Sequence, residues 1–561
     1  MSTLRTDNLE TTDSKYSISV RDLLTGGTGS RTVGTISELK ALSTLTNKRV
    51  IVAGYYTAGD SGLRVYYVPT VATGLVADGG SVIRADDGGW FVLATDGVFN
   101  VAHFGAKGDF ATDNSVAIQN AINAAGKYAK TNGTALRGGV VEFPAGIFNI
   151  GTGLVINDAQ VTLRGAGKYS TMLRPTTTTM VGVYVNGANT TIRDLEVSCA
   201  GAGTSASSIS IYVNASNCTI DNFVVGGSYT GLRLANGSGG RYSNFDMNDC
   251  VSTGVLIRGD NAQVFQNDSF FSNFLVINSD QTKFALGGIR IEGRAEAMMF
   301  KTGDLIGSVY PFTVDPVGTI GFRYSTFDSV FFDSGKNQAL FDTLYNVRFI
   351  NCWASSGREG NKPGISITNS KKVSWVGGMC FNSGSDGMYL LNCSEVSISD
   401  SDFTANAVGT GATGNGLAII GCSNVSVSNC TGSADTPNRQ VNGLFIDSTS
   451  SNVTLTGNGF TGNKTANYLI GTASVDMFGN RNLKTSNKGT GVLPASATSV
   501  TVPHGLTDAG GRNVTLASIS ITANGAVASP MYVASVNATN FVVAVLNANT
   551  GAAGFSWQAE V

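Results

Sequence analysis

The chain has 561 residues, of which only 14% are charged, and its formal net charge is −2. This balance excludes a strongly basic protein built to bind nucleic acid or an anionic membrane surface. With 71 glycines and 10 prolines, the composition suits turn-rich β structure, and not collagen or a disordered chain. There is no apolar run of about 18 residues and no apolar signal segment at the start, so we expect no membrane-spanning helix and folding in a cytoplasm.

Residues 1–98 divide into a polar segment and a small β-rich unit. Residues 1–35 are polar and contain the flexible sequence Gly-Gly-Thr-Gly-Ser at 26–30. Residues 36–98 hold short apolar and alternating runs around turn sequences, which predicts strands. These runs lie at 50–52, 63–68, 82–83 and 90–93.

An amphipathic helix is predicted next, at the start of a larger β region that covers residues 99–485. Its apolar residues recur at helical spacing and comprise Ala117, Ile118, Ala121, Ile122 and Ala125. Asp113 precedes them as the predicted N-cap. Such a helix can cover the unpaired edge of a first β coil, and the first strand is predicted within residues 138–146.

Residues 364–455 contain four copies of one unit. The glycines that open the copies, Gly364, Gly387, Gly416 and Gly443, lie 23, 29 and 27 residues apart, whereas the step from each glycine to a following valine is 9, 9, 9 and 10. No copy can bury its apolar face alone, so stacked copies must share one core. This pattern predicts an all-β right-handed parallel β-helix in which Ile367, Leu390, Ile419 and Ile446 lie one above another.

The repeat extends toward both ends of this region. Gly231 and Gly254 open copies 23 residues apart, and Gly288 follows after 34. Residues 292–320 break the pattern and are predicted to be an irregular insertion, while the repeat ends near Arg481. Residues 486–561 form a separate β-rich unit, with strands predicted at 499–502, 514–516, 532–533 and 541–545.

Cysteine and histidine usage limits the chemistry. The eight cysteines contain no CxxC sequence and no zinc-type cluster, so we expect buried free thiols, no metal and no cofactor. The two histidines, His103 and His504, lie outside the predicted coils, and both are expected to be structural. This disfavours Ser-His-Asp catalysis or a histidine base on the coils.

Two stretches of the chain carry a resemblance to known families. The sequence Phe-Gly-Ala-Lys-Gly-Asp at 104–109, with the helix at 117–122 and Val-Glu-Phe-Pro-Ala-Gly at 141–146, resembles the opening of pectate-lyase-like β-helix proteins. Residues 54–60 and 87–90 resemble the small domain that precedes the β-helix in tailspike proteins of tailed bacteriophages.

The resemblance implies a biological setting for each part of the chain. It implies that residues 1–35 attach to a phage tail or baseplate protein, that residues 36–98 are a head or neck domain, and that residues 486–561 cap, trimerise or bind carbohydrate. It also implies a homotrimer in the virion, made in the host cytoplasm and acting at the bacterial surface. Neither nucleic acid nor membrane insertion is implied.

The function implied by the resemblance is a depolymerase that binds and cleaves bacterial surface polysaccharide, an O-antigen or a capsule. This fold carries lyases, hydrolases and esterases. Because carboxylates are the acid–base groups left on the coils, we expect an endo-acting glycoside hydrolase that uses paired carboxylates. The alternatives are a polysaccharide lyase and a non-catalytic receptor-binding tail fibre.

Three carboxylates from consecutive predicted coils are the candidate catalytic residues. Three placements follow when residues 328–335 are aligned with residues 350–357 of the next coil. Asp333 then stacks on Ser355, and Glu359 lies just past the next turn. Asp386 comes from the following coil and lies on the same side. The candidate substrate-binding residues are Trp353, Phe381 and Tyr389, which suit sugar rings, and Arg358, which suits an acidic sugar. Aspartates also cap turns routinely, so each acid has that alternative role.

A second acidic cluster is the alternative catalytic site. It comprises Asp246, Asp249, Glu292 and Glu296, flanked by Arg258, Arg290 and Arg294. This mixture of acids and bases suits a lyase, in which a basic side chain abstracts a proton beside a neutralised uronate. The competing interpretation is a solvated, ion-paired surface. Asp400 and Asp402 resemble the acids of calcium-binding lyases, but we expect them to cap turns.

Overall fold

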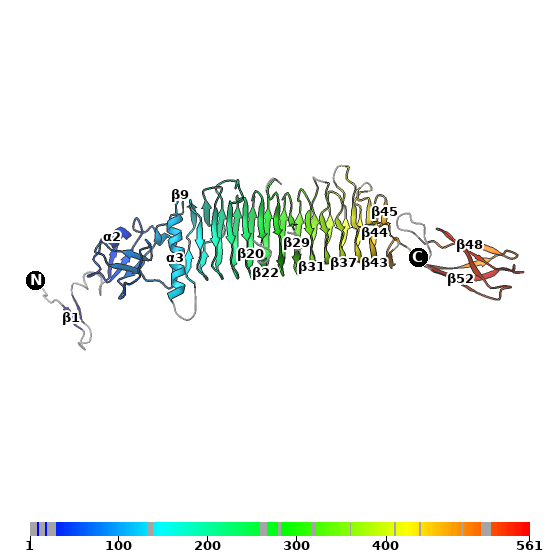
Figure 1. Ribbon diagram of the computed structural model, residues 1–561, viewed down its shortest axis with the longest axis horizontal. Coiled ribbons are helices and arrows are strands. Elements are labelled where there is room, and N and C mark those ends of the chain that lie inside the picture. Colours follow the sequence, from blue (N-terminus) through cyan, green and yellow to red (C-terminus); the bar gives the residue numbers. More distant parts are fainter. Residues whose placement is uncertain are drawn as a thin grey trace, which may run out of the picture. The chain divides into compact units, whose positions relative to one another are not determined.

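The computed structural model describes most of the chain, in ranges separated by short gaps. The described residues are 8–10, 17–19, 30–131, 138–258, 266–278, 282–315, 321–358, 361–408, 411–436, 439–472, 474–483, 486–506 and 518–560. They group into two compact units, one of Met1–Leu256 with Gln263–Phe274 and one of Ile257–Ala262 with Leu275–Val561. Both units consist mainly of β strands (Figure 1).

A small sheet opens the first unit, after a hairpin of β1 (Asn8–Glu10) and β2 (Ser17–Ser19). Its strands are β3 (Ser30–Val33), β4 (Arg49–Val52), β5 (Arg64–Tyr67), β6 (Val82–Arg84) and β7 (Trp90–Leu93), and helix α2 (Ile36–Lys40) follows β3. Val50, Val52, Tyr66 and Phe91 share its buried core. The four strands predicted within residues 36–98 are therefore present.

Helix α3 (Ser115–Thr131) covers the first coil, as predicted, and follows β8 (Val98–Asn100), the 3-10 helix η1 (Val101–Phe104) and β9 (Asp109–Asp113). The carboxamide of Gln119 exchanges hydrogen bonds of 2.8 and 2.9 Å with the backbone N–H and C=O of Val155. These bonds satisfy backbone groups at the edge of the first coil, and Figure 1 shows the helix beside the first strands of the stack. The prediction that Asp113 is the N-cap is wrong. Asp113 is extended and pairs with Asn149. The helix begins one residue later, because the C=O of Asn114 accepts the first helical hydrogen bond, from the N–H of Ile118.

Parallel coils follow α3. Their strands are β10 (Val140–Glu142), β11 (Gly146–Ile150), β12 (Leu154–Ile156), β13 (Thr162–Arg164), β14 (Thr171–Pro175), β15 (Val181–Val185), β16 (Thr191–Ser198), β17 (Ile209–Val213), β18 (Thr219–Gly226), β19 (Thr230–Leu234), β20 (Arg241–Asn248), β21 (Thr253–Arg258), β22 (Gln266–Asn267) and β23 (Phe270–Ile277). Val183, Ile211 and Leu232 pair in register from coil to coil, and all three are buried. Each coil thus adds one layer to a common core.

The second unit continues with two parallel sheets. Its first sheet contains β25 (Ala295–Glu296), β26 (Met299–Ile306), β28 (Phe322–Arg323), β29 (Thr326–Asp333), β31 (Tyr345–Ile350), β32 (Trp353–Ser355), β34 (Lys371–Val376), β35 (Met379–Phe381), β37 (Ser394–Ser399), β38 (Asp402–Thr404), β40 (Ser423–Ser428), β41 (Thr431–Ser433), β43 (Ser451–Thr456), β44 (Gly459–Thr461) and β46 (Val475–Phe478). Its second sheet contains β24 (Gly287–Glu292), β27 (Phe312–Asp315), β30 (Ala339–Asp342), β33 (Ile365–Thr368), β36 (Met388–Leu391), β39 (Asn415–Ile420), β42 (Asn442–Ile446) and β45 (Ala466–Ile470).

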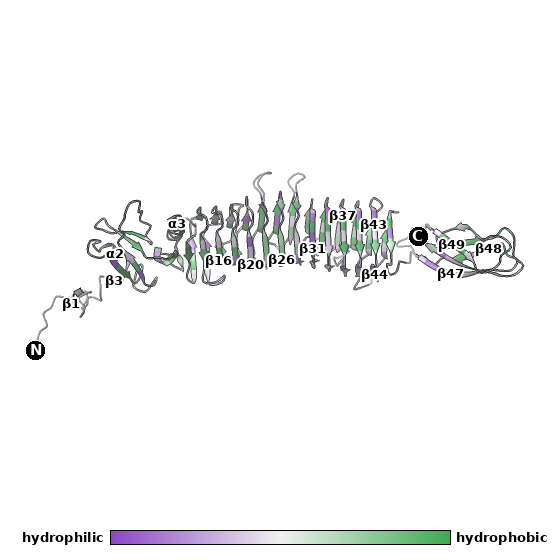
Figure 2. Cartoon of the chain, turned by 90° about the horizontal axis from the view of Figure 1, so that it is seen from below, coloured by the Kyte–Doolittle hydropathy of each residue, from purple (hydrophilic) through white to green (hydrophobic). Residues whose placement is uncertain are grey.

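The predicted core column is confirmed in the second sheet. Ile367 pairs with Leu390, Leu390 with Ile419, and Ile419 with Ile446, and all four side chains are buried. Hydrophobic and hydrophilic residues share the coil strands (Figure 2), as expected when alternate side chains face the core and the solvent. The expected break at residues 292–320 is wrong for the described part, because β26 pairs with β29 and β24 with β27 over this stretch.

The corners of the coils are left-handed residues, most of them asparagine, aspartate or glycine. Asn351, Gly377, Asp400 and Asn429 occupy one such corner in successive coils, with φ of 51°, 67°, 52° and 52°. The side-chain amide of Asn429 donates to the carboxylate of Asp400 over 3.2 Å. Short polar side chains tolerate this conformation and bond to neighbours, which explains why Asp400 lies at a corner.

Two three-stranded antiparallel sheets form the C-terminal part. One sheet contains β47 (Ser486–Leu493), β52 (Ala553–Glu560) and β49 (Ser518–Ala523), and the other contains β48 (Ser499–Pro503), β51 (Asn540–Ala544) and β50 (Tyr532–Val536). His504 is fully buried, and its Nδ1 accepts a hydrogen bond of 3.2 Å from the N–H of Leu506. The strand predicted at 514–516 lies outside the described residues.

All eight cysteines are free thiols, and all but Cys199 are buried. The seven buried cysteines therefore behave as small core side chains, as predicted. Within the described ranges, the helices are too short or too polar to cross a lipid bilayer.

Candidate active site

Of the three predicted catalytic acids, Asp333 occupies the position that the predicted alignment of neighbouring coils gives it. It is the last residue of β29 and pairs with Ser355. Asp386 follows β35 and accepts hydrogen bonds of 2.7 Å from both the backbone N–H and the side-chain amide of Asn415. Burial raises the pKa of Asp386. Its contacts are those of a turn residue, and Glu359 lies outside the described residues.

Three aromatic rings line the outer face of the first sheet next to Asp333. Trp353 and Phe381 stack with ring centroids 5.0 Å apart and planes 18° apart, and the Phe331 ring lies 4.8 Å from that of Trp353. Their strand neighbours Phe332 and Ala354 point into the core, so alternation turns the rings outward. We call Phe331, Trp353 and Phe381 the aromatic ladder. Flat apolar rings of this kind suit the apolar face of a sugar.

The other predicted substrate-binding residues lie in different places. Arg358 is exposed and close to Asp333, because it donates to the Ser355 hydroxyl over 2.9 Å and to the Asn382 carbonyl over 3.2 Å. Tyr389 belongs to the second sheet, where it pairs with Ser366 and Ala418. The structure therefore does not place Tyr389 on the aromatic ladder.

Asp304 is the candidate acid that sequence reasoning missed. It lies in β26 and pairs with Phe331, while Ile306, two residues later, pairs with Asp333. Its Oδ1 atom is buried and accepts no hydrogen bond from any described residue. Burial, and then the charge of Asp333, raises the pKa of Asp304 to about 6. A carboxylic acid that keeps its proton up to about pH 6 is a candidate proton donor.

Asp304 and Asp333 form a diagonal pair on neighbouring strands. Strands spaced about 4.8 Å apart that rise about 3.3 Å per residue place their Cα atoms about 8 Å apart. Side chains on one face of the sheet with this Cα separation can bring their carboxyl groups within the range of about 5–9.5 Å that glycosidases use to flank the bond that breaks. One acid with a raised pKa, one further carboxylate and an adjoining aromatic surface are the parts that glycosidic hydrolysis requires.

Three acids of the alternative cluster, Asp246, Glu292 and Glu296, form ion pairs with basic side chains. Glu292 contacts Arg258 and Arg290 at 3.2 and 2.9 Å, and Glu296 contacts Arg294 at 2.7 Å. Asp246, in the first unit, pairs with Lys168 at 2.8 Å and also accepts a hydrogen bond from the Tyr169 hydroxyl.

These contacts match the ion-paired alternative that the sequence left open. Asp249 occupies a left-handed corner with φ of 50°. Asp402 accepts a hydrogen bond of 2.8 Å from Thr431. Among the residues that the structure describes, no group of three or more acidic, histidine or cysteine side chains is arranged to hold a metal ion.

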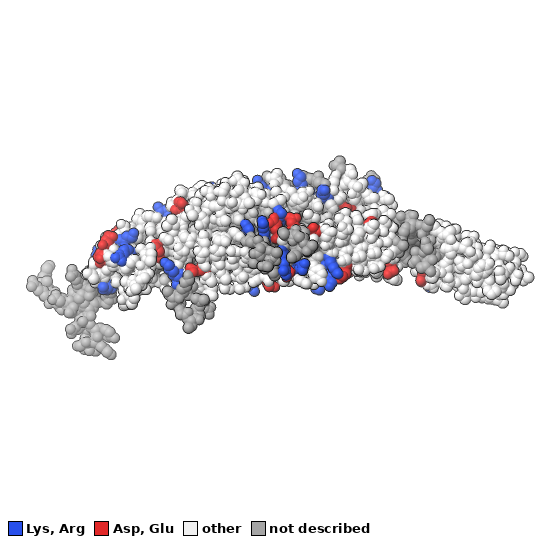
Figure 3. Space-filling view, viewed as in Figure 1, with Lys and Arg blue, Asp and Glu red and all other residues white. Residues whose placement is uncertain are grey.

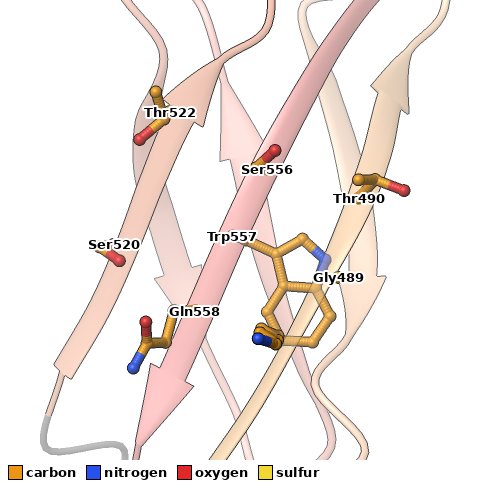
Figure 4. Close-up of a pocket in the computed structure, with 8 residues that line it drawn as sticks. Gly489, Thr490, Ser520, Thr522, Ser556, Trp557 and Gln558 are labelled. Carbon is orange, nitrogen blue, oxygen red and sulfur yellow. The ribbon is translucent and has the colours of Figure 1, made fainter.

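A polar pocket of about 600 Å³ lies on the sheet of β47, β52 and β49. Thr490, Ser556 and Thr522 lie in register across the three strands, and Gln558 lies two residues further along β52 (Figure 4). Lys488 contributes a positive charge. The described lining residues include no carboxylate, so this pocket can bind a polar ligand but lacks the acid pair of the first sheet.

The stacked parallel strands, left-handed corners and capping helix define the class of protein: a pectate-lyase-like right-handed parallel β-helix. Two family models match the chain, "Rhamnogalacturonase A/epimerase, pectate lyase-like" over residues 98–304 and "Right handed beta helix region" over residues 313–502. A comparison with curated proteins by sequence found no match.

Several solved structures resemble the chain, and phage tailspike proteins are prominent among them. Tailspike protein 3 of bacteriophage CBA120 has a TM-score of 0.53 and 15% identity, over 74% of this chain and 66% of that one. The A-module of mannuronan C-5 epimerase AlgE6 from Azotobacter vinelandii has a TM-score of 0.49 and 18% identity, over 68% of this chain and 98% of that one.

A third similar structure is tailspike protein gp49 of the Acinetobacter baumannii bacteriophage Fri1, described as a capsular polysaccharide depolymerase. It has a TM-score of 0.49 and 14% identity, over 94% of this chain and 98% of that one. The present chain covers 66% of tailspike protein 3 of bacteriophage CBA120, which is just under two thirds of its length. The likeness to that protein establishes the fold.

Proposed function

We propose that this protein is a phage tailspike depolymerase, an endo-acting glycoside hydrolase that binds and cuts a bacterial surface polysaccharide. The observation that carries the proposal is Asp304, a carboxyl group with a raised pKa beside a second carboxylate and an outward-facing aromatic ladder. The β-helix supplies a rigid frame on which adjacent coils present side chains to successive sugars.

In the proposed mechanism, the two acids divide the acid and base roles. A sugar ring packs on Trp353 and Phe381, which holds the glycosidic oxygen beside Asp304. Asp304 donates its proton to the leaving oxygen, and the Asp333 carboxylate activates water for attack on the anomeric carbon. Arg358, anchored on Ser355, is placed to contact polar groups of the same sugar.

The proposal extends to the setting of the protein. We propose that the N-terminal residues attach to the phage tail or baseplate and that the assembled spike is a homotrimer, as in the tailspike family that the sequence resembles. The mechanism above uses Asp304 and Asp333 of one chain and does not require a partner subunit.

Incubating the purified protein with bacterial surface polysaccharides tests the proposed reaction. We expect falling viscosity and new reducing ends on saturated oligosaccharides. Products with the ultraviolet absorbance of an unsaturated uronate would identify a lyase instead. Tight binding with no change in polymer length would identify a non-catalytic receptor-binding fibre, and so contradict the proposed hydrolysis.

Replacing Trp353 with alanine is expected to raise KM about tenfold with a smaller effect on kcat, because stacking holds the sugar before and during the reaction. Initial-rate kinetics on a defined oligosaccharide measure both constants. Tyr389→Ala is the matched control, since Tyr389 is an outward aromatic residue on the second sheet. A larger effect of Tyr389→Ala than of Trp353→Ala would move the sugar platform to the second sheet.

A further inference from the structure

A second groove of the second unit lies on the outer faces of β31, β34 and β37. It has a volume of about 450 Å³ and is lined by Asn346, Arg348, Lys372, Ser374, Glu395 and Ser397, among others. Arg348 pairs in register with Ser374, and Ser374 with Ser397. One guanidinium and two hydroxyl groups therefore form a row across three coils. We call this surface the basic groove.

The charge of the basic groove is only partly compensated. Glu395 contacts Lys371 at 2.9 Å, and nearby Asp328 lies 3.9 Å from Lys301. By contrast, Arg348 and Lys372, which line the groove, make no ion pair with any described residue, and the same holds for Arg323, which lies beside the groove against Tyr345. Most of the face seen in Figure 3 is uncharged, with Lys and Arg gathered beside Asp and Glu near its middle, and the net charge of the chain is −2. Two cations of the groove without an ion-pair partner, and a third beside it, therefore indicate a site for an anion.

An aromatic surface accompanies these cations. Tyr345 pairs in register with Arg323, and the Arg323 guanidinium lies 5.9 Å from the centre of its ring. The Lys372 ammonium donates to the Tyr345 hydroxyl over 3.3 Å and lies 5.4 Å from the same ring centre. Tyr324, half exposed, packs edge-on against Tyr345. Rings flanked by cations suit a sugar that carries a negative charge.

The left-handed corner that borders the basic groove carries residue types that are unusual for this backbone conformation. Asn346, Lys372 and Glu395 occupy a left-handed corner with φ of 55°, 58° and 56°, and Asn424 and Asn452 occupy it in the next two coils. Lysine and glutamate are less suited than asparagine to this conformation. Two of the three corner residues that line the groove are thus charged, where the next two coils have asparagine.

We propose that the basic groove is a subsite for an anionic sugar, so that the polysaccharide bound by this protein carries carboxylate or phosphate groups. Arg348 binds the anion through its planar guanidinium, Lys372 adds a second positive charge, and the hydroxyls of Ser374 and Ser397 bind the sugar. The inference rests on the proposed function and specifies its substrate class. Arg348 and Trp353 lie five residues apart on one coil, at most about 17 Å along the chain, so one oligosaccharide can reach both.

The test compares wild type and Arg348→Ala on purified bacterial polysaccharides of known composition. Each acidic polymer is used in its native form, after carboxyl reduction, and after chemical dephosphorylation. Wild type is expected to bind native acidic polymers at least about tenfold more tightly than the neutralised form, and Arg348→Ala is expected to lose that preference. Whichever treatment abolishes the preference identifies the anion as carboxylate or phosphate.

Arg439→Ala is the matched control, because Arg439 is a partly exposed arginine of the same unit that pairs with Asp435. It is expected to bind every polymer like wild type. The preference of wild type for acidic polymers should also shrink as salt is raised. Thermal melting checks that Arg348→Ala is folded, which is expected because Arg348 is exposed.

Two outcomes would overturn the inference, and they are distinguishable. If Arg348→Ala keeps the wild-type preference, or if wild type binds and cuts native and neutralised polymers equally well, the subsite is wrong and the depolymerase function stands. If wild type binds no polysaccharide at all, the proposed function fails, and the subsite fails with it.

Discussion

Asp304→Asn is expected to lower the rate of glycan cleavage by about 10²–10⁴-fold, the contribution of a general acid, while leaving glycan affinity nearly unchanged. Asparagine has the same shape but cannot protonate the leaving oxygen. Single-turnover and equilibrium binding measurements on one oligosaccharide separate the two effects. Asp328→Asn is the control, since Asp328 lies on the outer face of β29 opposite Lys301. A wild-type rate for Asp304→Asn would remove Asp304 from the reaction.

The raised pKa of Asp304 gives the same substitution a distinctive pH signature. Because the pKa is about 6 in the folded protein and about 3.9 in an unfolded chain, the folded state holds this proton more tightly. The resulting stability is fully present below the unfolded value and is lost as pH rises through about 6. Cleavage should fall over the same rise in pH, as the acid ionises.

At neutral pH the buried charge of Asp304 should therefore cost stability, and Asp304→Asn should melt at a higher temperature than wild type. The side chain is only partly buried, so we expect a gain of about 1 kcal/mol. Thermal melting at neutral and acidic pH measures it. An inactive variant that is also less stable at neutral pH would point to lost structure and not to lost proton transfer.

Phe327→Ala is expected to destabilise the second unit by about 3–5 kcal/mol. Phe327 is fully buried between Phe300 and Phe349, with ring centroids 4.9 and 4.8 Å away and planes 8° and 4° apart. Each coil contacts only its neighbours, so a cavity in this column weakens two interfaces at once. Urea denaturation followed by hydrogen exchange in β26, β29 and β31 measures the loss.

Phe331→Ala is the matched control, four residues further along the same strand. Phe331 faces outward on the aromatic ladder, so its removal is expected to weaken glycan binding and to cost far less stability than Phe327→Ala. If the two substitutions destabilise the protein equally, the inward and outward assignments within β29 are wrong.

The core of the coils was predictable because it depends on local alternation and on a fixed glycine-to-valine step. Ile367 and Leu390 pair as expected for that reason. The register of Asp333 on Ser355 followed from the same alignment of neighbouring coils. These features need only the pattern along the chain and the spacing of stacked strands.

The missed features depend on contacts that no local pattern contains. Asp304 was overlooked because its coil turns at Thr302, where other coils have asparagine, and the stretch was therefore interpreted as an irregular insertion. The contact of Lys168 with Asp246 joins residues 78 positions apart. Tyr389 is predicted to bind sugar with Trp353 and Phe381, because proximity in the sequence does not distinguish the two sheets of a coil.

The structure of the Asp304→Asn variant with a bound oligosaccharide tests the central claim most directly. We predict a sugar ring packed on Trp353, with a glycosidic oxygen within hydrogen-bond reach of residue 304 and the next sugars extending toward Arg348. An oligosaccharide held elsewhere, for example on the sheet of β47, β52 and β49, with the aromatic ladder bare, would contradict the account.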